Sequence, residues 1–103
     1  MDSINKLLAV RRSHRKFTEE KVSEADVRQM VRAALIAPSS KGLHSPEVVV
    51  IEDVPTIQAL SRCKDMGADF LAGAPLVIAV LADSSLSDVW IEDASIASIF
   101  MQL

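Results

Sequence analysis

The sequence lacks most residues that cross-link a chain, bind metals or stack on bases. Cys63 is its single cysteine, which excludes an internal disulfide and a cysteine-rich metal site. His14 and His44 are far apart, with no Glu or Cys at ligand spacing, so no metal site is expected. The chain has no tyrosine, one tryptophan and three phenylalanines, and therefore no aromatic platform for nucleic acid. One cysteine suits a reducing compartment, and we expect a cytoplasmic protein.

Long hydrophobic runs are also missing. The longest, residues 70–82, contains Gly73 and Pro75 and is too short to span a bilayer. Residues 1–6 do not resemble a signal peptide. The length of 103 residues suits one domain, residues 1–103, and not two.

What the chain has in excess is apolar surface and local basic charge. Half of its residues are hydrophobic, which is more than a small domain can easily bury. We therefore expect a partner surface, either a second subunit or a further part of the same fold. Residues 1–41 contain nine Lys and Arg against five Asp and Glu, whereas residues 42–103 contain two against nine. A basic region this local suits a small anion better than a polyanion.

Residues 11–17, Arg-Arg-Ser-His-Arg-Lys-Phe, are the most informative stretch. Arginine offers a planar fork of donors that matches phosphate oxygens, and serine adds a short donor. Alternation along an extended backbone would place Arg11, Ser13 and Arg15 on one side. A phosphate site is one interpretation, and a solvated basic turn is the other.

The apolar spacing predicts two helices in the first part of the chain. Residues 4–10 carry an apolar stripe that Asp2 or Ser3 can cap, and the helix should end at the arginines. Phe17 is then expected to anchor this segment in the core. Ser23 is a good N-cap for a second helix, which should run to about Ala37 because a proline follows.

The middle of the chain reads as a polar loop, two strands and short helical pieces. The loop spans residues 38–46 and has the composition of a functional loop or of an ordinary turn. Strands are predicted at 47–51 and 76–81, both continuously apolar and so expected to be central and buried on both faces. A short helix at 56–63 should bury Ile57, Leu60 and Cys63, and 69–72 should form one helical turn.

The last predicted element is a helix that begins near Ser87 or Asp88, either of which could cap it. Its surface is apolar nearly all round, which indicates a buried helix. Asp93 is the one polar residue off its narrow polar stripe. The helix reaches Leu103 without a C-cap signal, so we expect the chain to be part of a larger folding unit.

Taken together, these segments resemble the N-terminal half of the FMN-dependent nitroreductase family. The resemblance covers nearly the whole chain and rests on residues 11–17, 37–41, 48–53, 74–78, and on Trp90 with residues 92–94. It departs from the common family pattern at Gly42 and at Ser45-Pro46, in the loop that shapes the flavin and substrate pocket. The family's C-terminal half has no counterpart in these 103 residues.

The resemblance implies a fold, a cofactor and site residues. The fold class is α+β, a mixed sheet flanked by helices, here partial and completed by a dimer partner or a C-terminal half. An intertwined homodimer with FMN at each end of its interface is implied. Arg11, Ser13 and Arg15 would hold the FMN phosphate and ribityl chain, with Arg12 beside them. Pro38, Ser39 and Ser40 would approach the flavin ring from the other subunit.

The function implied is an NAD(P)H-dependent oxidoreductase. Electrons would pass through FMN to a nitroaromatic, quinone or other small electrophile by a ping-pong mechanism. No side chain has to act as acid, base or nucleophile, and none is assigned as catalytic. The choice between NADH and NADPH stays open, since no nicotinamide fingerprint is present. Two alternatives are a non-catalytic interaction module that has lost FMN and an anion sensor that uses the arginines alone.

Overall fold

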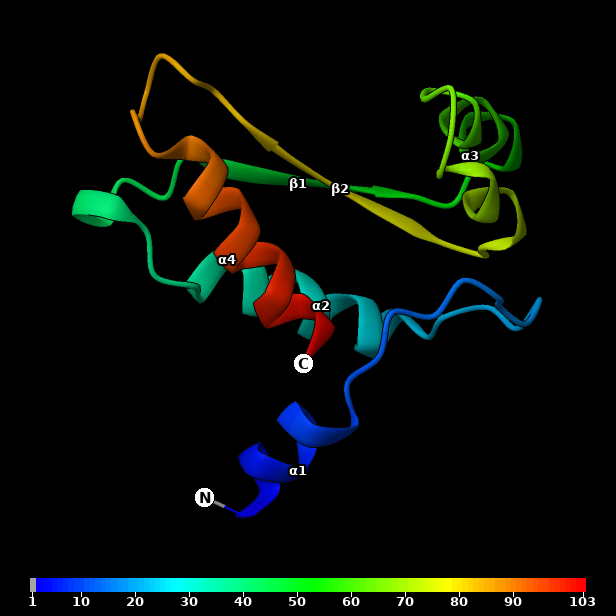
Figure 1. The fold of residues 1–103 in the computed structure, drawn as a ribbon, viewed down its shortest axis with the longest axis horizontal. Coiled ribbons are helices and arrows are strands. Elements are labelled where there is room, and N and C mark those ends of the chain that lie inside the picture. Colours follow the sequence, from blue (N-terminus) through cyan, green and yellow to red (C-terminus); the bar gives the residue numbers. More distant parts are fainter. Residues whose placement is uncertain (1) are drawn as a thin grey trace.

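The computed structural model describes residues 2–103, which form the α+β architecture that the sequence predicts (Figure 1). Four α-helices, two 3-10 helices and two strands occur in this range, in the order α1 (Asp2–Val10), α2 (Glu24–Ile36), η1 (Ser40–Gly42), β1 (Pro46–Ile51), α3 (Val54–Ser61), η2 (Asp69–Gly73), β2 (Val77–Ala82) and α4 (Trp90–Gln102). Helices α2 and α4 pack on each other and on the strands. Helix α1 lies apart from this unit (Figure 1).

Helix α2 begins and ends where its capping residues predict. The Ser23 hydroxyl accepts a hydrogen bond from the backbone N–H of Asp26 at 3.1 Å. This bond satisfies one of the donors that a helix N-terminus leaves free. The helix stops at Ile36, just before Pro38, so both predicted ends are confirmed.

The two strands pair directly and antiparallel, with Val48 opposite Val80. These two valines pack against the core, because α2 and α4 lie on that face. Val49 and Val50 remain 43% and 39% exposed. The expectation of central strands buried on both faces is therefore wrong for this chain, where each strand has one neighbour within residues 2–103.

The buried core is small and made mainly of alanine. Its buried members are Ala34, Ala37 and Ala97, with Val48, Val80, Ile96 and Met101 packed around them. Larger apolar side chains on α4 stay exposed, including Ile91, Ile99 and Phe100. Within residues 2–103 one face of α4, that of Asp93 and Ala97, packs inward. The predicted burial of its other sides would need a surface that this single chain does not provide.

Helix α3 has Asp53 as its N-cap. The Asp53 carboxylate accepts hydrogen bonds from the N–H and hydroxyl of Thr56. Ile57 is buried at 2% exposure, as predicted. Cys63 lies beyond the helix and is exposed, so its expected place in the core is wrong. The predicted helical turn is confirmed as η2, which packs against α3.

Three further predictions need correction. Asp2 and Ser3 lie within α1, so they do not precede it as caps. Phe17 is 42% exposed and contacts the ring of Phe70, not the core. Helix α4 begins at Trp90 after turns at residues 84–86 and 88–89, and its N-cap is Val89, so neither Ser87 nor Asp88 caps it. No helix within residues 2–103 has the length and apolar character needed to cross a membrane.

Candidate functional site

The arginine cluster (Arg11, Arg12 and Arg15) follows directly on α1. The Arg11 N–H donates to the Leu7 carbonyl at 3.0 Å and completes the last helical turn. The Arg12 guanidinium donates through Nη1 to the carbonyls of Ala9 and Arg11, at 3.1 and 2.8 Å. A cation suits the negative end of a helix, so part of Arg12 serves to cap α1.

Arg15 leans on an aromatic pair further along the chain. Its guanidinium carbon lies 5.9 Å from the centroid of the Phe70 ring, within reach of a cation–π interaction. The rings of Phe17 and Phe70 are 6.2 Å apart between centroids. Arg15 also donates to the Ser13 carbonyl at 3.3 Å. Phe70 belongs to η2. Its contacts with Arg15 and Phe17 therefore support the connection between α1 and α2, which is otherwise without regular structure.

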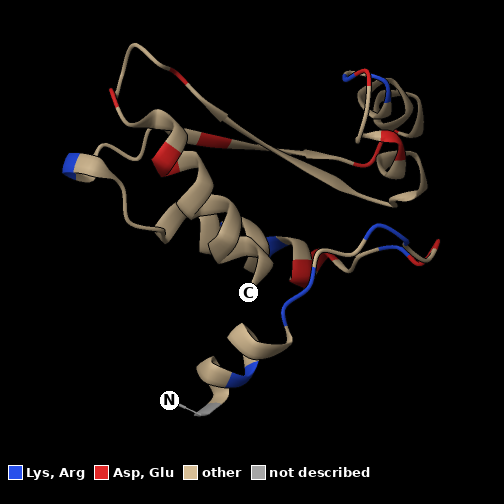
Figure 2. Cartoon of the chain, in the orientation of Figure 1, with Lys and Arg blue, Asp and Glu red and all other residues tan. Residues whose placement is uncertain are grey.

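The charge of the cluster is not neutralised inside the described chain. Among the side chains of residues 3–103 the one salt bridge joins Arg28 to Glu24, on the surface of α2. Figure 2 shows the basic residues gathered along the connection between α1 and α2. Arg12 and Arg15 are exposed and Arg11 is partly exposed. Their remaining N–H donors are therefore free to bind an anion.

The second group of predicted site residues is Pro38, Ser39 and Ser40, between α2 and β1. Both serines belong to the serine loop (residues 39–44), which Pro38 precedes. Lys41 and His44 have left-handed backbones, with φ of 56° and 49°, a conformation that most residues avoid. Gly42 adopts φ of 64° between them. The Ser39 Oγ accepts the N–H of His44 at 2.8 Å. This bond ties the two ends of the loop together.

Asp93 fixes the same loop from α4, and the sequence analysis did not assign it to the site. It is 3% exposed. Its Oδ1 accepts the Ser40 N–H at 3.0 Å, and its Oδ2 accepts the Ser87 hydroxyl at 3.4 Å. The signal was present in the sequence, since Asp93 is the one polar residue off the polar stripe of this helix.

The two predicted groups lie at opposite ends of α4. Asp93, in its first turn, bonds to Ser40, whereas Gln102, at its end, donates to the Arg12 carbonyl at 3.4 Å. Nine residues separate the two contacts, roughly 14 Å along a helix axis. A cavity of about 380 Å³ is lined by Arg11, Arg12 and the end of α4. A separate one of about 40 Å³ is lined by Pro38, Ser39 and Asp93.

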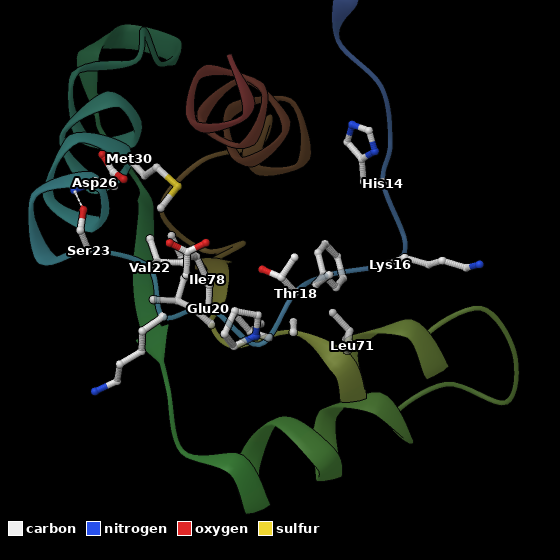
Figure 3. Close-up of a pocket in the computed structure, with 16 residues that line it drawn as sticks. His14, Lys16, Thr18, Glu20, Val22, Ser23, Asp26, Met30, Leu71 and Ile78 are labelled. Carbon is white, nitrogen blue, oxygen red and sulfur yellow. Dashed lines mark hydrogen bonds between the residues drawn. The ribbon is translucent and has the colours of Figure 1, made fainter.

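A larger cavity, of about 830 Å³, contains neither group (Figure 3). It lies between the connection that carries His14 and Thr18, the N-terminal part of α2, and the start of β2 at Ile78. Figure 3 shows the Lys16 side chain directed away from it. The interior is largely apolar, with Met30 and Leu71 among its walls. Size alone therefore does not make it the anion site.

The other titratable residues singled out in the sequence do not form a second centre. His14 and His44 are exposed on separate segments, and His44 lines the small cavity beside Ser39. Within residues 2–103 no group of His, Cys, Asp and Glu could hold a metal. Hydrogen bonds from Thr56 lower the pKa of Asp53, and those from Ser85 lower the pKa of Asp83. Both acids lie outside the candidate site.

Comparison with known proteins assigns the fold to a family. A model of the nitroreductase family matches residues 8–63, just over half of the chain. The chain belongs to the nitroreductase family. The matched region includes both the arginine cluster and residues Pro38–Ser40, while Asp93 and α4 lie beyond it.

Solved structures of nitroreductases superimpose closely on this chain. An FMN-dependent nitroreductase from Clostridium difficile R20291 gives a TM-score of 0.90 at 44% identity, covering 92% of this chain and 56% of its own. A protein from Desulfovibrio desulfuricans, provisionally named a nitroreductase and solved with FMN, gives 0.85 at 27% identity, covering 96% and 59%. The predicted fold class is thus confirmed, as a partial nitroreductase fold.

A curated relative from Archaeoglobus fulgidus is provisionally named an NADH dehydrogenase/NAD(P)H nitroreductase. It is 29% identical in an alignment of 102 residues that covers 95% of this chain and 58% of the relative. The chain therefore spans less than two thirds of the length of the nitroreductases it matches.

Proposed function

We propose that this nitroreductase-family chain contributes to an FMN-dependent oxidoreductase that takes electrons from NAD(P)H. The single observation that carries the proposal is the arginine cluster, because its guanidinium groups form no salt bridge with a carboxylate among the side chains described, those of residues 3–103. A phosphate would satisfy several of these donors at once. Family membership and the FMN named for two structural relatives support this choice of anion.

In this proposal Arg11, Arg12, Ser13 and Arg15 bind the phosphate and ribityl chain. Arg11 has the most freedom, since none of the hydrogen bonds within the described residues uses its guanidinium. Arg12 keeps its cap on α1 and adds charge beside the ligand. Arg15 can leave Phe70 at little cost, because an exposed cation–π contact is worth only about 0.5–1 kcal/mol.

Pro38, Ser39 and Ser40 would border the flavin ring. The Ser39 Oγ already accepts one hydrogen bond, which leaves its O–H free to donate to a ligand. When bound, FMN would supply the hydride chemistry by a ping-pong mechanism, with a nitroaromatic, a quinone or another small electrophile as acceptor. The protein's part is position, charge and exclusion of water, and no side chain is assigned as acid or base.

The site is proposed to combine residues of two copies of the chain. Its phosphate and ring groups lie at opposite ends of α4, and α4 exposes Ile91, Ile99 and Phe100 along its length. A homodimer that buries these apolar side chains would bring the arginine cluster of one copy toward the serine loop of the other. Exposed apolar patches of this kind commonly mark association surfaces.

The direct test is the visible spectrum of the purified protein, as its own gene encodes it. We expect a yellow protein whose flavin absorbance bleaches on addition of NADH or NADPH and returns on addition of a quinone. Intact mass measured on the same sample defines the polypeptide tested. A colourless protein that neither takes up added FMN nor oxidises NAD(P)H would refute the proposal and favour the non-catalytic interaction module.

A further inference from the structure

Asp93 is the most unusual residue of the core. It is a carboxyl at 3% exposure on the face of α4 that otherwise buries Ala97. No basic side chain within residues 2–103 forms a salt bridge with it. Burial of a carboxyl is unfavourable unless hydrogen bonds compensate for lost water. The neighbouring Glu92 is exposed and already places an acidic residue in the first turn of α4. The helix dipole therefore does not explain why Asp93 is buried.

The compensation for Asp93 comes from the serine loop. Its Oδ1 accepts the Ser40 N–H at 3.0 Å, across 53 residues of sequence. That bond enters the loop immediately before the left-handed Lys41, with φ of 56°. Strained backbone persists where the surrounding structure fixes it. Asp93 from outside and Ser39 from inside, through its bond to the His44 N–H, supply that restraint.

We propose that Asp93 is the positioning residue of the ring side of the site. By holding the Ser40 N–H it sets the serine loop in the conformation that presents the Ser39 hydroxyl to the ligand. The inference rests on the proposed function for the identity of the ligand, FMN. It does not require Asp93 to touch the flavin, because it acts through Ser40.

Two substitutions separate hydrogen bonding from mere bulk. Asp93→Asn keeps an oxygen that can accept from the Ser40 N–H, and its NH₂ can donate to the Ser87 hydroxyl. Asp93→Ala removes both bonds and leaves the Ser40 N–H without its partner. Glu92→Ala is the matched control, since it removes the adjacent carboxylate from the same helical turn without touching the loop.

The first measurement is hydrogen exchange of the Ser40 amide in the protein without flavin. Asp93→Ala should raise its exchange rate by about tenfold or more, the effect of losing one hydrogen bond. Asp93→Asn and Glu92→Ala should stay close to the parent rate. Equal exchange in all four proteins would overturn the proposal whether or not the protein binds FMN.

The second measurement is FMN affinity by fluorescence titration. Asp93→Ala should weaken binding by about tenfold to a hundredfold, whereas Asp93→Asn should recover most of the affinity. Ala97→Gly, which loosens the same face of α4, serves as a control for stability. If it weakens FMN binding as much as Asp93→Ala at a matched loss of Tm, the role of Asp93 is only structural and the proposal fails. A parent protein that binds no FMN refutes the proposed function and the ligand assignment here, while the exchange data still decide whether Asp93 positions the loop.

Discussion

The two segments that carry the proposed flavin contacts differ in how the chain holds them. The serine loop is fixed by bonds at both ends, from Asp93 to the Ser40 N–H and from Ser39 to the His44 N–H. The connection of residues 11–22 has no helix or strand. It is supported mainly by the contacts of Arg15 and Phe17 with Phe70 and by the distant bond of Gln102 to the Arg12 carbonyl.

The difference follows from the side chains that each segment uses. A serine hydroxyl or a backbone N–H is short, so its backbone must be placed before the ligand arrives. An arginine reaches its ligand over a long flexible chain and tolerates a looser backbone. We therefore propose that the ring side of the site is preformed and that the phosphate side becomes ordered when its ligand binds.

The largest effect is expected from removing the arginines that are proposed to bind the phosphate. Replacing Arg11 and Arg15 together by alanine removes two charge-assisted interactions of about 1.5–3 kcal/mol each. FMN binding should weaken by about a hundredfold or more, as measured by fluorescence titration. The Arg28→Ala, Arg32→Ala protein is the charge-matched control, because both arginines lie exposed on α2. Unchanged retention of FMN after loss of Arg11 and Arg15 would remove the cluster from the site.

Local signals allowed most of the fold to be predicted from the sequence. The cap at Ser23, the proline after α2 and the apolar runs of both strands act through neighbouring residues, and the structure confirms each. The 3-10 turn η2 was equally local. The arginine cluster and residues 38–40 could also be recognised in the sequence as candidate site residues, because their composition differs from that of the helices beside them.

Most differences from the sequence predictions concern burial, which depends on contacts distant in sequence. Apolar periodicity predicted buried strands and a buried α4, yet Val49, Ile99 and Phe100 are exposed in this chain. An apolar side chain indicates that burial of its surface is favourable. It does not indicate whether the same chain or a partner buries it. Asp93 was missed for the same reason, because its partner Ser40 is 53 residues away.

A second prediction tests whether the serine loop is truly preformed. Gly42→Ala should destabilise the protein by about 1–2 kcal/mol, the strain of a left-handed residue with a side chain. The cause would be φ alone, since nothing lies within 4 Å of the added methyl group. Gly73→Ala is the matched control, with equal space but no positive φ, and should stabilise by about 0.4–1 kcal/mol. Equal Tm values for both variants would show that the loop is loose.

A third prediction concerns the support of the connection. Phe70→Leu keeps apolar bulk but removes the aromatic partner of Phe17 and Arg15. We expect a loss of about 1 kcal/mol from these aromatic contacts, measured by thermal unfolding, and lower NMR order parameters for the backbone of residues 14–17. The order parameters of the serine loop should stay as before, because its restraints come from Asp93 and Ser39. Lower order parameters in both segments would contradict their independence.

The smallest expected effect lies where the serine loop enters β1. Ser45 is 6% exposed, and its hydroxyl has no hydrogen-bond partner within the described residues. Ser45→Ala should therefore leave the free energy of unfolding unchanged or raise it by up to about 1 kcal/mol, because it removes a buried unsatisfied group. Thermal unfolding measures the change. Ser61→Ala is the matched control: Ser61 is 5% exposed and donates to the Gln58 carbonyl at 2.6 Å, so its loss should cost about 1 kcal/mol. If Ser45→Ala destabilises as much as Ser61→Ala, the Ser45 hydroxyl is bonded in solution, and Asp93 and Ser39 do not restrain the loop alone.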